Sequence, residues 1–202
     1  MRLTLQRWWF AAVATRWLPL ALVGLVLALD AVSSQVPFHV VWTGLLDEPA
    51  HLATTAVVLL ALVPRWCRDH PGLSLVVLAS STLIDVDHVP LFLGVDAVAA
   101  TPMSRPFTHS LLTPLVLVAL AVLVTRARPV LLAAAAGVTL HFTRDLGTGD
   151  GLPLVWPLST GDVAVPYAVY VAALVVVAGV GLVTPVRASR AGRPDRVTTS
   201  VG

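Results

Sequence analysis

Six apolar runs alternate with short polar segments along the chain. Pro64, Pro71, Pro129 and Pro185 stand near the ends of these runs, where helices commonly begin or stop. A bilayer crossing takes about 20 apolar residues, so several of the runs are short for a full crossing. We expect an all-α fold, a polytopic transmembrane bundle of about six helices, at residues 17–32, 50–63, 73–84, 110–124, 130–146 and 163–183.

The composition is that of an integral membrane protein. Of the 202 residues, 57% are hydrophobic and only 12% are charged, and the mean hydropathy of +0.87 lies far above that of a soluble domain. We expect a single integral membrane domain over residues 1–186 and a disordered cytoplasmic tail over residues 187–202. The first apolar run fits either a signal peptide or an uncleaved anchor, and its long basic flank favours the anchor.

Arginine supplies every basic side chain. The thirteen arginines are scattered and give a net charge of only +2, so we expect no nucleic-acid partner. With the N-terminus inside, eleven of the thirteen fall in segments predicted to face the cytoplasm. The two exceptions, Arg105 and Arg144, lie in the outer half, which also holds nine of the eleven acidic residues. The pattern predicts a multi-pass protein of the inner (plasma) membrane, with both termini cytoplasmic and a polar site facing outside.

Four short polar segments on the predicted outer side hold most of the potential metal ligands. They are residues 47–51, 85–88, 105–110 and 141–145. All four lie at ends of predicted helices that point the same way, so we expect them to converge. The single cysteine, Cys67, excludes an intrachain disulfide and a CxxC-type zinc site. A metal here must therefore be held by imidazole and carboxylate groups.

The spacing within these segments suits ligand pairs. Glu48 shares a helical face with His51, as does His141 with Asp145. Asp85 and Asp87 flank a single residue, and in an extended turn both carboxylates would point to one side, with His88 beside them. Acids and histidines at membrane depth are costly and usually functional.

Two of the polar residues have simple structural explanations. Asp47 comes before Glu48 and Pro49 in what resembles a helix start, so we expect Asp47 to be an N-cap and leave it out of the site. Thr108 is expected to cap a helix that begins at His109.

Other residues leave alternatives open. Asp145 near a helix C-terminus opposes the helix dipole and needs a cation, which either Arg144 or a metal would supply. Asp30 either lines the site or reaches interfacial water, and Asp85 and Asp87 also suit a turn at the water boundary. His39 and His70 lack acidic company comparable to that of the other histidines and are expected to lie in loops.

These segments resemble the YdjM-type membrane-bound metal-dependent hydrolases, a family of bacterial inner-membrane proteins. Together with His51, the segments that carry the resemblance run in the family's order, at residues 84–88, 105–112, 141–145 and 151–157. The family often has Pro-Asp-Ile-Asp-His and a His-Arg-Gly before its Thr-His-Ser. This chain has Ile84 before Asp85 and Ser104-Arg105-Pro106 instead, so one possible ligand is absent. The resemblance implies metal-dependent hydrolysis.

The leading hypothesis is a hydrolase with one or two divalent ions. The mixed nitrogen and oxygen ligands suit zinc best, with manganese or iron as alternatives. Glu48 or Asp87 is expected to take a proton from the attacking water, and Arg105 and Arg144 to hold an anionic group such as phosphate. The expected ligands are His51, Asp85, Asp87, His109, His141 and Asp145, with His88 as support.

Membrane lipids are the expected partners, and a phosphoester in a lipid headgroup is the expected substrate. A cavity at the outer interface would reach amphiphiles more readily than soluble metabolites, and its expected border is Phe38, Trp42, Leu91, Phe92 and Trp156. A divalent-metal transporter is the main alternative, although transport sites usually lie near the bilayer midplane. A non-catalytic protein whose metal ties the helices together is the third possibility.

Overall fold

The long helices of the protein match the six apolar runs of the sequence. The computed structural model describes residues 11, 13, 15–36, 40–93, 95, 99–100, 105–149 and 151–183. Its long helices are α2 (Leu18–Ser33), α3 (Val40–Leu62), α5 (Pro71–Leu83), α7 (Leu112–Leu123), α8 (Arg128–Thr148) and α9 (Tyr167–Val183). The short elements are α4 (Pro64–Asp69), η1 (Ile84–Asp87), α6 (His88–Phe92) and η3 (Thr125–Ala127). The all-α expectation is confirmed. The tail after residue 183, Phe38 and His39 lie outside the described residues.

Prolines open several of these helices. Pro64, Pro71 and Pro129 occupy the first turns of α4, α5 and α8. A first-turn residue has no intrahelical acceptor for its N–H group, so proline loses no hydrogen bond there.

Large apolar side chains cover the outside of the bundle, and its interior combines apolar clusters with a group of buried polar residues. Large apolar side chains such as Leu115, Leu123 and Val176 are exposed, whereas His51, His141 and Asp145 are buried. By length and composition, Leu45–Leu62 and Pro71–Pro90 are candidate membrane spans, α7 and α8 form an apolar pair bent by 117°, and α2 and α9 are shorter apolar helices. Lipid is the solvent that suits this surface.

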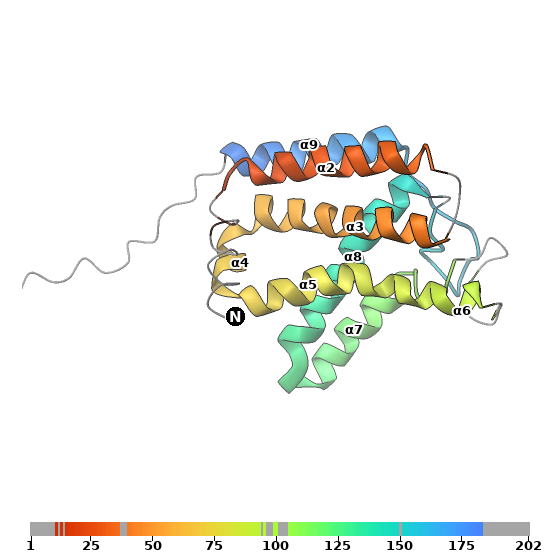
Figure 1. The fold of residues 1–202 in the computed structure, drawn as a ribbon. Coiled ribbons are helices and arrows are strands. Elements are labelled where there is room, and N and C mark those ends of the chain that lie inside the picture. Colours follow the sequence, from red (N-terminus) through yellow and green to blue (C-terminus); the bar gives the residue numbers. More distant parts are fainter. Residues whose placement is uncertain are drawn as a thin grey trace, which may run out of the picture.

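Helix α3 lies at the centre of the bundle, between the α2–α9 pair and α5, and α8 crosses behind it to pair with α7 (Figure 1). The crossing of α8 over α5 depends on Gly137, because a Cβ there would stand 2.3 Å from the carbonyl oxygen of Val77. The end of α2, the beginning of α3, the end of α5, the end of α8 and the beginning of α9 all lie at one end of the bundle (Figure 1). The polar segments predicted to converge therefore share that end.

Helix α3 begins earlier than the sequence indicates. It starts at Val40 and contains Pro49 in its interior. A proline inside a helix removes one backbone hydrogen bond, but it does not end a helix that is held by packing on both sides. The expectation that Asp47 is an N-cap is therefore wrong, because Asp47 lies within the helix.

Candidate metal centre

Five ligand-type side chains from four parts of the fold meet at the end of the bundle. Helix α3 contributes His51, η1 contributes Asp85, the loop before α7 contributes His109, and α8 contributes His141 and Asp145. The three imidazoles are completely buried. We call these five residues the central group.

The two carboxylates of the central group face the Nε2 atoms of its histidines. Oδ1 of Asp85 lies 3.0 Å from Nε2 of His109 and 3.3 Å from Nε2 of His141. Oδ2 of Asp145 lies 3.0 Å from Nε2 of His141, and its Oδ1 lies 3.3 Å from Nε2 of His51. Two ligands about 2.0–2.1 Å from one tetrahedral ion are themselves about 3.3–3.4 Å apart. These four nitrogen–oxygen pairs therefore lie close to the separation of two ligands on one ion.

Two histidine rings are held in a defined orientation by their Nδ1 atoms. Nδ1 of His141 lies 2.8 Å from the carbonyl oxygen of Ser81 and donates its hydrogen to it. Nδ1 of His109 lies 3.2 Å from Oδ2 of Asp87, which also accepts a hydrogen bond from the Thr108 hydroxyl. These contacts at Nδ1 orient the two rings so that Nε2 of His109 faces Asp85 and Nε2 of His141 faces Asp145, as the partners of metal-binding histidines do.

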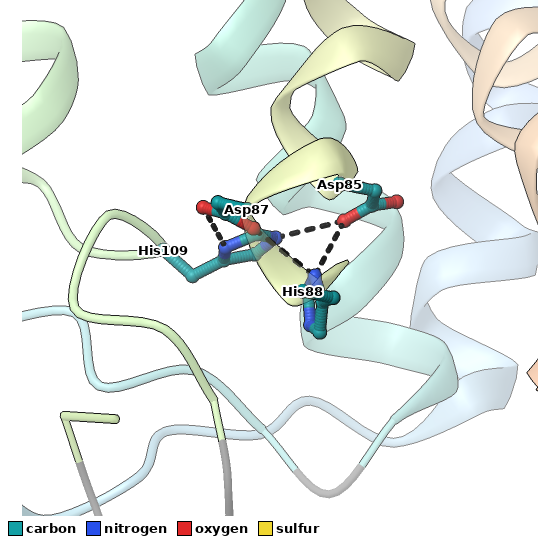
Figure 2. Close-up of side chains that lie close together, drawn as sticks. All are labelled: Asp85, Asp87, His88 and His109. Atoms are coloured by element: carbon teal, nitrogen blue, oxygen red, sulfur yellow. Dashed lines mark hydrogen bonds and ion pairs between the residues drawn. The ribbon is translucent and has the colours of Figure 1, made fainter. Parts of the chain in front are cut away.

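Asp87 and His88 flank the central group (Figure 2). Nδ1 of His88 lies 3.1 Å from Oδ1 of Asp87 and 3.4 Å from Oδ1 of Asp85. Asp85, Asp87, His88 and His109 offer ligand atoms that all lie within 4.8 Å of one another. Asp85 and His109 are also members of the central group. The side chains thus have the composition to hold a metal ion.

The extended turn predicted at residues 85–87 is wrong. These residues form the 3-10 turn η1, in which residues two apart do not point the same way because a turn takes three residues. Asp85 consequently faces Nε2 of His109, and Asp87 faces Nδ1 of the same ring (Figure 2). Thr108 is no helix cap either: α7 begins at Leu112, and the Thr108 hydroxyl bonds Asp87 instead.

His109 lies in the loop outside the helical spans. Its burial acts to lower the pKa of the imidazole, but the hydrogen bonds to Asp85 and Asp87 prevail and raise the pKa above its ordinary value. A cation bound at Nε2 must therefore compete with a firmly held proton.

His51 shows most clearly that a cation fits. Its Nε2 lies 3.3 Å from Asp145, 3.5 Å from Asp47 and 4.0 Å from Asp85. Neither ring nitrogen has a hydrogen-bond partner among the described residues. An ion held between the three carboxylates and this nitrogen would satisfy it. Asp47, left out on sequence grounds, therefore belongs beside the site, and its i, i+4 spacing from His51 was the available signal.

The two arginines play different parts. Arg144 is 3% exposed, and it donates to Asp47 at 2.8 and 3.0 Å and to Asp30 at 2.7 Å. Arg144 therefore does not neutralise the charge of Asp145. Because its guanidinium already donates to two carboxylates, Arg144 is poorly suited to the predicted role in binding an anionic substrate. Arg105 donates to Oδ2 of Asp145 at 3.1 Å, so Arg105 is the cation that offsets Asp145.

A polar cavity of about 690 Å³ adjoins the central group. Its lining includes Asp30, Asp47, Arg105, Arg144, Asp145 and Tyr167. The Tyr167 hydroxyl donates to Asp30 at 2.8 Å. The backbone at Gly149 leaves room for the guanidinium, since a Cβ there would stand 2.4 Å from an Arg105 nitrogen. The central group is therefore next to a space large enough for a small ligand.

The segment after α8 braces the His109 loop. Phe107 stacks on Trp156 with ring centroids 5.1 Å apart, and the Leu111 N–H donates to the Leu154 carbonyl at 3.0 Å. Trp156 packs against this loop, a contact that the expected cavity border did not include. The side chains of Trp42, Leu91 and Phe92, also expected at that border, lie outside the described part of the structure.

Glu48 lies at the edge of the site. It interacts with Asp85 and His51, and its Oε2 is buried without a hydrogen-bond partner in the described part of the chain. The structure thus brings together every residue predicted for the metal site and adds Asp47. Arg144 lines the cavity but donates to Asp30 and Asp47.

A comparison with known protein families gives a match over most of the chain. The model of the YdjM inner membrane protein family matches residues 46–199, which include every member of the central group. No curated protein and no solved structure matches the chain significantly. Because the match covers well over half of the sequence, the chain belongs to the YdjM inner membrane protein family.

Proposed function

We propose that this protein is a membrane-embedded metal-dependent hydrolase that acts on a phosphoester of a lipid headgroup at the outer face of the membrane. The observation that carries the proposal is the central group itself, in which buried imidazole and carboxylate ligands stand at ion-binding separations beside a cavity of about 690 Å³. Structural metal sites are closed, whereas catalytic sites keep an open position for water or substrate. A cavity at the ligands favours catalysis.

The central group would hold a divalent ion, for which its three nitrogen and two oxygen ligands favour zinc over manganese or iron. When bound, such an ion supplies Lewis-acid chemistry, polarising a phosphoryl oxygen and activating water. Asp87 and the Ser81 carbonyl keep the His109 and His141 rings oriented. Asp87 thus acts by positioning His109, in addition to its predicted roles as ligand and base.

Glu48 takes the proton from water in this proposal. Its buried Oε2 lacks a hydrogen-bond partner within the described residues, and it lies next to Asp85. Arg105 orients the anionic part of the substrate, because it lines the cavity and is already held by Asp145. Arginine suits this task because its fixed fork of donors matches phosphate oxygens.

The test is release of a headgroup from defined phospholipids by the purified protein in lipid nanodiscs, followed by phosphorus NMR. Wild type is compared with Glu48→Gln and with Asp162→Asn, an exposed acid in the loop before α9. Loss of a general base typically costs 100-fold or more, so Glu48→Gln should retain metal and lose turnover by about that factor, while Asp162→Asn should match wild type. Metal-loaded wild type that cleaves no phospholipid would refute the proposal.

A further inference from the structure

An apolar groove of about 500 Å³ runs between α5, α7 and α8. Its walls are formed by Leu83 and Ile84 at the end of α5, Leu117 of α7, and Ala134 and Val138 of α8. Leu83 is 64% exposed and belongs to the candidate span Pro71–Pro90. The groove therefore opens on the surface that faces the hydrocarbon of the membrane.

One end of this groove is polar and belongs to the metal centre. Asp87 and Thr108 both line it, and the Thr108 hydroxyl donates to Asp87. Asp87 in turn faces the ring of His109, a member of the central group. A lipid chain that fills the groove would lie among aliphatic side chains and end beside Asp87 and Thr108.

The polar cavity beside Arg105 completes the pattern. It touches the central group at Asp145, whereas the groove reaches the same group through Asp87. The two spaces share no lining residue. An apolar space and a polar, arginine-lined one thus border the candidate metal centre at Asp87 and at Asp145, which matches the division of an amphiphile into tail and headgroup.

We infer that the groove between α5, α7 and α8 binds an acyl chain of a membrane lipid whose headgroup lies in the cavity beside Arg105. This inference deepens the proposed function and rests on it, because it assigns the substrate to the long-chain lipids and places the bond to be cleaved at the central group. Pockets of 300–1,000 Å³ hold most of a drug-sized ligand, so about 500 Å³ accommodates part of one chain and leaves the remainder in the bilayer.

Photo-crosslinking tests the groove without any need for turnover. The protein is reconstituted in phosphatidylethanolamine–phosphatidylglycerol vesicles that contain phosphatidylglycerol with a diazirine in its acyl chain, and adducts are mapped by mass spectrometry. In wild type we expect adducts on the α7 and α8 residues that line the groove, reduced by an excess of unlabelled long-chain lipid and not by its short-chain analogue.

Two variants and a control separate the groove from the general lipid-facing surface. Ala134→Phe fills the groove from α8, and Leu117→Trp fills it from α7 if the first variant folds poorly. Ala119→Phe introduces the same ring as Ala134→Phe on the exposed side of α7. We expect groove adducts to fall at least fivefold in the filling variants and to be unchanged in Ala119→Phe, with bound metal equal in all.

Each outcome decides between the alternatives. Adducts that are spread evenly over the outer surface, or that are equally abundant in Ala134→Phe and Ala119→Phe, would overturn the inference. Absence of adducts in wild type, as expected when a partner helix fills the groove, would also overturn it. Failure of the proposed function is recognised separately, as groove adducts on a protein that binds no metal or cleaves no lipid.

Discussion

Asp85 is the carboxylate on which the metal centre depends most. Its Oδ1 lies within 3.4 Å of nitrogens from His109, His141 and His88, and its Oδ2 lies 4.0 Å from Nε2 of His51. Asp85→Asn keeps the shape of the side chain and removes its negative charge. The prediction is a large loss of metal affinity with little change in fold.

The magnitude follows from the position of Asp85. Changing a residue that only supports a ligand usually weakens metal binding 10- to 100-fold. Asp85 belongs to two of the sets of side chains that could hold an ion, so its loss should exceed the upper end of that range. A 100-fold weakening corresponds to about 2.8 kcal/mol.

The assay is competition for zinc against a chelator of known affinity in detergent-purified protein. Asp69→Asn is the matched control, because Asp69 is an exposed acid at the opposite end of the bundle. The account expects Asp85→Asn to weaken zinc binding by 100-fold or more and Asp69→Asn to leave it within a factor of two. Equal dissociation constants for both variants would refute the role assigned to Asp85.

Three further predictions concern the surroundings of the centre. Gly149→Ala should displace the Arg105 guanidinium, because the new Cβ would stand only 2.4 Å from an Arg105 nitrogen. We expect kcat/KM for an anionic lipid to fall about tenfold while zinc affinity is unchanged. An equal loss of kcat/KM and zinc affinity would contradict this prediction. Arg144→Met should leave the carboxylates of Asp30 and Asp47 without their cation. The free energy of unfolding should fall by roughly 3 kcal/mol, the low end for a buried ion pair, because Asp47 is partly exposed. The measurement is Tm in lipid-like detergent, and an unchanged Tm would contradict the prediction. Zinc affinity should fall as the pH drops, because the raised pKa of His109 keeps its ring protonated to a higher pH and the proton must leave before metal binds. Titration calorimetry between pH 6 and pH 8 measures this dependence. A zinc affinity that does not change with pH would contradict the prediction.

The helices of this fold can be predicted from the sequence because lipid imposes a simple rule. A chain whose outer surface is apolar needs long apolar runs, and the six runs became the six long helices. The beginning of α3 could not be placed, because Asp47, Glu48 and Pro49 have the local signature of a helix start. Packing of α3 against α2, α5 and α9 overrides that local signal.

The ligands were predictable and their pairings were not. Histidines and acids at membrane depth stand out in an apolar chain, so His51, Asp85, His109 and the others could be chosen from the sequence alone. The choice of Arg144 between Asp145, its neighbour, and Asp30, 114 residues away, depends on how α2 and α8 meet in space. The 3-10 turn that directs Asp85 and Asp87 to different nitrogens of one ring was equally hidden, since the same letters suit an extended turn.

The central claim is that the buried histidines and aspartates hold a divalent ion. The most direct measurement is the metal content of detergent-purified protein by mass spectrometry, in wild type and in a variant that combines His141→Ala with Asp145→Ala. The account predicts close to one or two equivalents of metal in wild type and a loss of most of it in the variant. Wild-type protein that remains free of metal after incubation with zinc, manganese and iron would contradict the account.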